Sequence, residues 1–198
     1  MNEDPIVILA GGKGMRMREH TETIPKALVP IGPFPVVLHV MKTYAKYGYK
    51  KFILCLGYKA NIIKEYFLNH KAFSNDFTLS IKNNKTTFHS EPPQPWNITF
   101  ADTGEDTLTG GRIKKIEKYI NEDDFFMTYG DGLSDIDINA LLSYHHLKNK
   151  TITLTGTKPH TRFGVLDINS NGIAKSFSEK PQSYPLINGG FCVLKSSI

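Results

Sequence analysis

The stretch that decides the fold lies near the start of the chain and reads Pro5-Ile6-Val7-Ile8-Leu9-Ala10-Gly11-Gly12-Lys13-Gly14-Met15-Arg16. Its first six residues form a short, continuous apolar run, and two glycines end that run. A run of this kind is typical of a strand that is buried on both faces of a parallel sheet. We therefore predict a central strand over residues 5–10, with a glycine-rich loop at its carboxyl end.

The elements that follow alternate between helix and strand. Apolar side chains recur at helical spacing over residues 35–47 and again over residues 61–70. Between these predicted helices, residues 51–56 form a second apolar run, which predicts a strand. This order indicates a parallel sheet with right-handed crossovers.

The rest of the chain has shorter patterns, and we expect residues 77–100 to form a hairpin and a loop. Helices are predicted over residues 112–120 and 138–147, and strands over residues 125–129, 151–157, 165–168, 173–178 and 186–194. Together these elements predict an α/β, Rossmann-like fold in which flanking helices cover a mixed, mostly parallel sheet with an antiparallel portion toward the end. The 198 residues suit a single domain.

Composition and charge limit the classes of function. No apolar run approaches the roughly 18 residues that cross a bilayer, and the start of the chain lacks the basic region of a secretory signal. We therefore expect no membrane partner and a cytoplasmic location. The 24 basic residues exceed the 19 acidic ones but are spread along the chain, so a small polyanionic substrate is favoured over nucleic acid. Cys55 and Cys192 lie in apolar runs and predict neither a disulfide nor a metal site.

The glycine-rich loop has the composition of a phosphate-binding loop. Its glycines allow backbone N–H groups to approach oxygen atoms closely, and Lys13 and Arg16 could neutralise a polyphosphate. A dinucleotide fingerprint would need a glycine where Met17 stands, and a Walker-type loop would need Gly-Lys-Ser/Thr. A simple tight turn remains an alternative. The position after a buried strand favours phosphate, because open α/β sheets bind ligands beyond the carboxyl ends of their strands.

Two further positions could act on the same ligand. Asp131 stands between two glycines after the strand predicted over residues 125–129. Mg²⁺ usually takes one or two carboxylates plus substrate phosphates, so Asp131 is a candidate metal ligand. Lys26 lies between Pro25 and Pro30, and this rigid segment could direct it at a phosphate. Taken singly, an Asp-Gly turn and a solvent-facing lysine are the simpler interpretations.

In combination and in order, these motifs resemble those of the sugar-1-phosphate nucleotidyltransferases, whose fold is of the nucleotide-diphospho-sugar transferase type. One segment resembles the glucose-1-phosphate cytidylyltransferases of that family in particular, and it reads Asp102-Thr103-Gly104-Glu105-Asp106-Thr107-Leu108-Thr109-Gly110-Gly111-Arg112. The other motifs that carry the resemblance are Leu9-Ala10-Gly11-Gly12-Lys13-Gly14-Met15-Arg16, Pro25-Lys26, Gly130-Asp131-Gly132, Glu179-Lys180-Pro181 and Asn188-Gly189-Gly190.

The resemblance implies a reaction and a set of site residues. The reaction is the Mg²⁺-dependent transfer of CMP from CTP to a sugar 1-phosphate, above all α-D-glucose 1-phosphate, which gives CDP-glucose and pyrophosphate. Catalytic roles are implied for Arg16, Lys26 and Asp131, with Mg²⁺ on Asp131, and a homo-oligomer is implied as well. The implied nucleotide-binding residues are Leu9, Ala10, Gly11, Gly12, Gly14, Arg16, Lys26, Thr107, Arg112 and Gly130. The implied sugar-phosphate residues are Glu179, Lys180, Asn188 and Gly189.

The chain departs from the family pattern in two respects. Lys13 stands where the family usually has leucine, and Met15 where it has threonine, so the loop gains a charge and loses a hydroxyl. The family also continues past Ile198, where it has a second Mg²⁺-binding aspartate. We therefore expect residues 1–198 to form one nucleotidyltransferase domain without that C-terminal segment.

Other functions remain open at this point. A related transferase could use another nucleotide or another phosphorylated acceptor, and a nucleotide-binding module could bind CTP without forming product. A nicotinamide-dependent oxidoreductase is disfavoured by Met17. His145 and His146 are adjacent on a predicted helix, so we expect them to point in different directions and to serve packing and surface roles instead of binding a metal.

Overall fold

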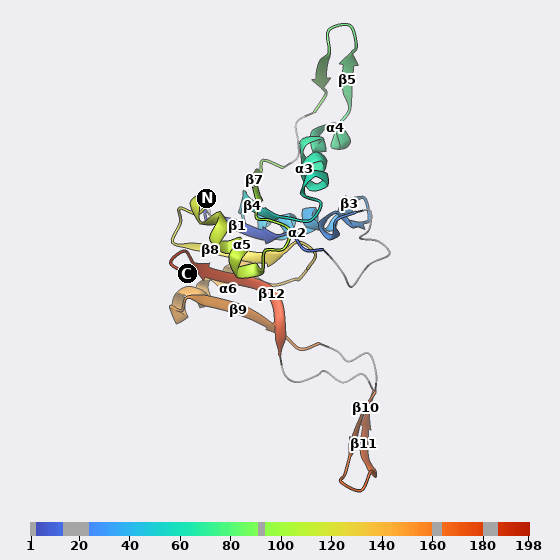
Figure 1. Ribbon diagram of the computed structural model, residues 1–198, viewed down its shortest axis with the longest axis vertical. Coiled ribbons are helices and arrows are strands. Elements are labelled where there is room, and N and C mark those ends of the chain that lie inside the picture. The colour runs from blue at the N-terminus through green and yellow to red at the C-terminus, as the bar shows by residue number, and fades with distance from the viewer. Residues whose placement is uncertain (1–2, 14–23, 91–93, 160–163, 180–185) are drawn as a thin grey trace.

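The computed structural model describes residues 3–13, 24–90, 94–159, 164–179 and 186–198. Its centre is a six-stranded sheet with the strand order β7-β4-β1-β8-β12-β9 (Figure 1). Strand β1 (Ile6–Leu9) lies between β4 (Lys51–Leu56) and β8 (Asp124–Tyr129) and pairs with both in parallel. The predicted central strand is therefore confirmed.

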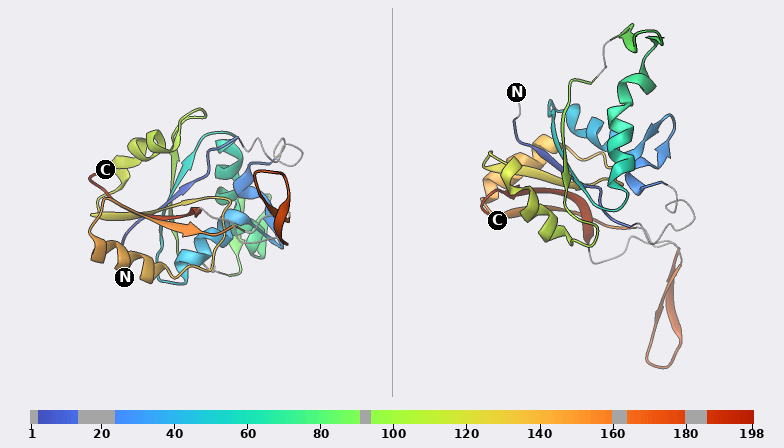
Figure 2. Two further views of the ribbon diagram at one scale, coloured as in Figure 1. Left: turned by 90° about the horizontal axis from the view of Figure 1, so that it is seen from below. Right: turned by 45° about the horizontal axis from the view of Figure 1, so that its top comes forward.

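Successive side chains of β1 enter two different hydrophobic cores. Ile6 and Ile8 join the core beneath α2 (Val36–Ala45), α3 (Ala60–Leu68) and α6 (Ile138–Lys148). Val7 joins the core beneath α5 (Thr109–Ile116) on the other face. The left view of Figure 2 shows α5 on one side of the sheet and α2 and α6 on the other. A strand covered on both faces must be apolar at every position, which explains its continuous apolar run.

The antiparallel portion that the sequence predicts is strand β12 (Ile187–Lys195). It pairs in an antiparallel manner with β8 on one side and with β9 (Ile152–Thr157) on the other. Its first residues therefore lie at the edge of the sheet where β8 ends.

The expectation for residues 77–100 is wrong in one respect. A hairpin does form, from β5 (Phe77–Ser80) and β6 (Lys85–Phe88). The supposed loop, however, runs into β7 (Asn97–Asp102), which pairs in parallel with β4 at the edge of the main sheet. Because β7 is an edge strand and only partly buried, it lacks the continuous apolar run of β1 and β4.

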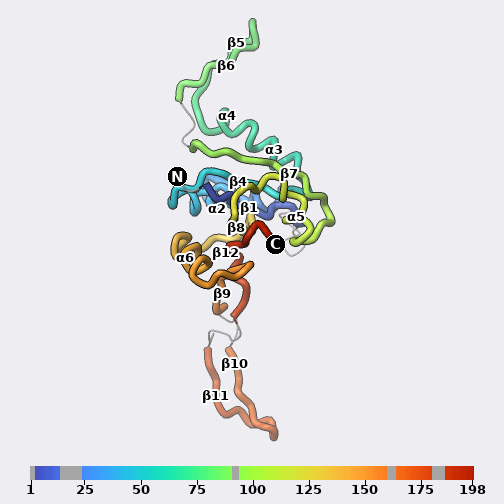
Figure 3. Tube along the Cα trace, turned by 90° about the vertical axis from the view of Figure 1, so that its left-hand side faces the viewer, coloured from blue at the N-terminus to red at the C-terminus, as the bar shows by residue number. Residues whose placement is uncertain are grey.

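Helix α5 also begins earlier than predicted, at Thr109, and is followed by a short 3₁₀ helix, η3 (Glu117–Tyr119). A second hairpin, β10 (Val165–Ile168) with β11 (Ala174–Ser178), lies at the opposite end of the molecule from β5 and β6 (Figures 1 and 3). Cys55 and Cys192 are buried free thiols, as expected. The remaining elements are η2 (Lys26–Leu28), β2 (Pro30–Ile31), β3 (Phe34–Pro35) and α4 (His70–Ser74).

The two adjacent histidines have the packing and surface positions that were expected, since His145 is buried and His146 is exposed, but their rings converge on one carboxylate instead of pointing in different directions. His145 is fully buried, with its Nδ1 2.8 Å from Thr153 Oγ1 and its Nε2 3.4 Å from Asp124 Oδ1. The Nε2 of His146 lies 2.8 Å from the other oxygen of Asp124. Both rings thus reach one carboxylate at the start of β8, and they connect α6 to the sheet. The described residues include no group of three His, Cys, Asp or Glu side chains suited to a metal ion.

Among the described residues, no helix combines the length and the apolar character that a membrane span requires.

Candidate active site

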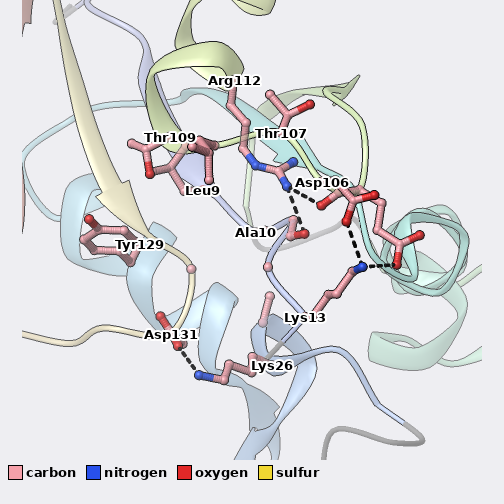
Figure 4. Close-up of a pocket in the computed structure, with 16 residues that line it drawn as sticks. Leu9, Ala10, Lys13, Lys26, Asp106, Thr107, Thr109, Arg112, Tyr129 and Asp131 are labelled. Carbon is pink, nitrogen blue, oxygen red and sulfur yellow. Dashed lines mark hydrogen bonds and ion pairs between the residues drawn. The ribbon is translucent and has the colours of Figure 1, made fainter. Parts of the chain in front are cut away.

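A pocket of about 410 Å³ opens where β1 and β8 end (Figure 4). Parallel strands place their carboxyl ends at one edge of a sheet, so the loops that follow them meet there. Segments far apart in the sequence therefore line one cavity. The lining includes the following residues that the sequence predicted: Leu9, Ala10, Gly11, Gly12, Lys26, Thr107, Arg112, Gly130 and Asp131.

Arg112, on α5, forms the inner wall of the pocket and is only 6% exposed. Its Nη1 donates to Leu56 O at 3.0 Å and to Thr103 Oγ1 at 2.6 Å. Its Nη2 donates to Gly11 O and to Glu105 O, each at 3.1 Å. A buried guanidinium is tolerated when its donors are satisfied in this way. In this structure these nitrogens join the glycine-rich loop, the end of β4 and residues 103–105.

This arginine also explains two of the glycines. A Cβ atom on Gly11 would collide with Arg112 Nη1, and one on Gly57 would lie 2.8 Å from the same nitrogen. Gly12 differs, because a Cβ there would meet no atom within 4 Å. Gly11 is thus required by the packing of Arg112, whereas the space beside Gly12 is open to a ligand.

Lys26 and Asp131 lie on the opposite side of the pocket from Arg112 and Thr107 (Figure 4). Lys26 begins η2, directly after Pro25, and its Nζ lies 3.4 Å from Asp131 Oδ2. The two side chains are 26% and 45% exposed, so solvent and ligands can reach both. The sequence predicts these residues from separate motifs, and the structure brings them into one ion pair.

Sequence reasoning gave no role to Glu105, Asp106, Thr109 or Tyr129 of the pocket, and it predicted that Lys13 would neutralise phosphate, whereas the structure pairs Lys13 with two carboxylates. Lys13 Nζ lies 3.2 Å from Glu105 Oε1 and 2.8 Å from Asp106 Oδ1. The hydrogen bond from Lys13 lowers the pKa of the Asp106 carboxyl and raises the pKa of the lysine. Tyr129 and Thr109 also line the cavity. The acidic pair lies inside the segment over residues 102–112, and no local pattern connects it to Lys13, which is 93 positions from Asp106.

Of the predicted sugar-phosphate residues, the three within the described part of the chain (Glu179, Asn188 and Gly189) do not line this pocket. Asn188 and Gly189 lie at the start of β12, and a Cβ on the next residue, Gly190, would lie 3.1 Å from the Tyr129 ring. Glu179 follows β11 beside Gly164, at the base of the distant hairpin. Gly14, Arg16 and Lys180 are outside the described residues.

Comparison with known proteins identifies the family to which this chain belongs. A family model described as nucleotidyl transferase matches residues 6–198. The chain is 46% identical over 194 residues to the glucose-1-phosphate cytidylyltransferase of Salmonella typhimurium, across 97% of this chain and 75% of that protein. It is 47% identical over 192 residues to the probable glucose-1-phosphate cytidylyltransferase of Bacillus subtilis, with the same coverage. The solved structure of HddC from Yersinia pseudotuberculosis superposes with a TM-score of 0.66 at 27% identity, over 98% of this chain and 77% of that one.

Proposed function

Since this chain belongs to the nucleotidyl transferase family, we propose that it transfers CMP from CTP to α-D-glucose 1-phosphate, with Mg²⁺, to give CDP-glucose and pyrophosphate. The observation that carries the proposal is the pocket at the carboxyl edge of the sheet, in which Lys26 and Asp131 face a wall made by the glycine-rich loop and Arg112. The names of relatives at 46% and 47% identity support the choice of nucleotide and sugar.

The pocket has the size and chemistry for a nucleotide. Its volume of about 410 Å³ lies within the range of roughly 300–1,000 Å³ that small-molecule sites occupy. Open space beside Gly12 allows backbone N–H groups to approach phosphate oxygens. Lys26 supplies a positive charge that solvent and ligand can reach.

The residues of the pocket fit a hard cation such as Mg²⁺. Mg²⁺ keeps several waters and usually binds one or two carboxylates together with substrate phosphates. Asp131 offers such a carboxylate, and the described residues include no larger group of ligands that would favour a transition metal. Asp131 would therefore hold Mg²⁺ jointly with the phosphates of the nucleotide. When bound, the ion would reduce the negative charge that the attacking phosphate must approach.

The protein's own part in the reaction is mainly positioning and charge stabilisation. A phosphate monoester has its second pKa near 6, so the attacking oxygen of the sugar 1-phosphate is already anionic at neutral pH and needs no general base. That oxygen forms a bond to the α-phosphorus of CTP, and the bond from the α-phosphorus to the departing pyrophosphate breaks. Lys26 would leave Asp131, contact the phosphates and stabilise the charge that grows on the pyrophosphate. We assign Arg16 to the same phosphates.

The acceptor would bind beside the start of β12. Asn188 and Gly189 lie one strand beyond β8, and their neighbour Gly190 lies against Tyr129 of the pocket. We assign Glu179 to the sugar hydroxyls and Lys180 to the acceptor phosphate. This arrangement would direct the sugar phosphate toward the triphosphate for in-line attack.

A substrate panel tests the proposed function. CTP, UTP, GTP, ATP and dTTP are each combined with glucose 1-phosphate or mannose 1-phosphate, and pyrophosphate release is measured with and without Mg²⁺. We expect kcat/KM to be highest for CTP with glucose 1-phosphate, with CDP-glucose identified by mass spectrometry and no turnover without Mg²⁺. A different preferred pair would overturn the assignment of substrates. CTP binding in calorimetry without product from any pair would favour a nucleotide-binding module.

A further inference from the structure

A second group of charges, which the proposed chemistry does not use, lies at the exposed edge of the pocket. This rim cluster consists of Lys13, Glu105 and Asp106, with the two contacts of 3.2 and 2.8 Å drawn in Figure 4. All three side chains are largely accessible, at 44%, 50% and 87% exposed. One ammonium thus faces two carboxylates, so the rim cluster has a net negative charge.

The backbone beneath the rim cluster is held in place by Arg112. The Nη2 of this buried residue donates to Gly11 O and to Glu105 O, each at 3.1 Å. The backbone at Gly11 is therefore held next to the segment that contains the two carboxylates. Lys13, two residues after Gly11, lies within reach of Glu105 and Asp106.

Stability does not account for the rim cluster. Exposed ion pairs contribute little to folding, because water screens them and ordering two long side chains costs entropy. The position of the cluster gives it a different consequence. Two carboxylates at the edge of a pocket repel a triphosphate, and this repulsion acts over roughly 10 Å, the screening length at about 0.1 M salt.

We propose that Lys13 remains paired with Glu105 and Asp106 instead of binding phosphate, and that it sets nucleotide affinity by offsetting the negative charge of the pocket rim. The proposal rests on the proposed nucleotide site. It makes Lys13 a positioning residue that acts through its two partners.

The test compares three variants with the wild-type protein. Lys13→Leu leaves both carboxylates without their lysine, Glu105→Gln with Asp106→Asn removes their charges, and a triple variant combines all three changes. Calorimetry with CTP and Mg²⁺ gives the Kd of each. We expect Lys13→Leu to weaken binding about fivefold, with most of the loss gone at about 0.5 M salt. The effect should appear in KM for CTP and not in kcat.

The triple variant decides between charge compensation and direct phosphate binding. If Lys13 acts by offsetting the carboxylates, the triple variant binds CTP at least as tightly as the wild type, because its rim has no net charge. If Lys13 contacts phosphate or closes the pocket mechanically, the triple variant stays about as weak as Lys13→Leu, and the proposal fails. Lys114→Leu is the matched control. Lys114 is on the same helix as Arg112 but does not line the active-site pocket, and it is an exposed lysine whose Nζ lies 2.6 Å from Glu117 Oε2. An equal loss in this control would also overturn the proposal.

A measurement without nucleotide separates this inference from the proposed function. The pairing lowers the pKa of the Asp106 carboxyl, so carboxyl-detected NMR titration should show that pKa rise in Lys13→Leu. An unchanged pKa would mean that the pair does not exist in solution, whatever the protein binds. If the wild type binds none of the triphosphates, the proposed function fails. The proposed effect of the rim cluster on nucleotide affinity then fails as well, even if NMR detects the ion pair.

Discussion

Two clusters of charged side chains lie at opposite ends of strand β8, and they are built in different ways. At the amino end, the carboxylate of Asp124 contacts the rings of His145 and His146 on α6. Close by in the sequence, Glu122 Oε1 lies 2.6 Å from Lys51 Nζ. At the carboxyl end, Asp131 Oδ2 lies 3.4 Å from Lys26 Nζ, and both side chains line the same side of an open pocket. The side chain of Asp124 is 14% exposed and that of Asp131 is 45% exposed.

The difference separates a buried group that connects elements of the fold from an exposed ion pair that contributes little to stability. The carboxylate of Asp124 is shared between two imidazoles and connects a helix to the sheet. The pair between Asp131 and Lys26 is longer and more solvated, so it can be broken at low cost. In open parallel sheets, ligands bind at the carboxyl edge, because the loops that follow the strands form a cleft there.

The largest effect is expected from one substitution made at each end of β8. Asp131→Asn should lower turnover about 10³-fold, because it removes the carboxylate proposed to hold Mg²⁺, and change the free energy of unfolding by less than about 0.5 kcal/mol. Asp124→Asn should lower that free energy by about 1 kcal/mol and keep turnover within about twofold. Pyrophosphate release and urea unfolding measure the two quantities. If the two variants exchanged these effects, the distinction between the ends would be wrong.

Arg112 sharpens the distinction, because it lies at the carboxyl end yet is buried and bonded to protein oxygens. Arg112→Met leaves those acceptors without their donor and should lower the free energy of unfolding by about 2–3 kcal/mol, measured in urea. Lys115→Met is the control, because Lys115 is on the same helix and bonds Thr103 O and Thr107 Oγ1 from a more exposed position; its loss should stay below about 1 kcal/mol. If Arg112→Met lost CTP binding but kept its free energy of unfolding, the arginine would serve ligand binding and not the stability of the fold.

The smallest effect concerns Asp4, at the amino end. Burial raises the pKa of its carboxyl, and the negative charges of Asp124 and Glu122 raise it further. Because the folded pKa exceeds the unfolded one, stability falls as the pH rises through the interval between them and stays lower above it. Asp4→Asn should therefore raise the free energy of unfolding by roughly 0.5 kcal/mol near pH 7, a modest value because the side chain is partly exposed.

The gain from Asp4→Asn should disappear below the ordinary aspartate pKa of 3.8, where Asp4 is protonated in both states. Urea unfolding near pH 7 and near pH 3.5 checks both halves of this expectation. Asp76→Asn, at an exposed aspartate, is the control and should change little at either pH. A gain that is equal at both pH values would rule out the ionisation of Asp4 as its cause.

The elements that could be predicted are those whose burial is simple. Strands β1 and β4 are covered on both faces and therefore have continuous apolar runs, and α2 has one regular apolar face. Strand β7 could not be recognised, because an edge strand that is only partly buried has a mixed pattern and here follows a Pro-rich segment. The start of α5 was misplaced because Gly110 and Gly111 obscure its first turn.

The sequence by itself determined the α/β fold and the positions of the glycine-rich loop after β1 and of the carboxylate after β8, because each of these is a local pattern of a few adjacent residues. Only the tertiary structure decided which residues act together. Lys26 and Asp131 are 105 positions apart, and Lys13 and Asp106 are 93 apart, so no local pattern could connect them. The tertiary structure also showed that a side chain on Gly11 would collide with Arg112, whereas the space beside Gly12 is open. The physical reason is that the carboxyl ends of parallel strands lie at one edge of the sheet. Residues that are far apart in the sequence become neighbours there, and these neighbours determine which charged groups form pairs.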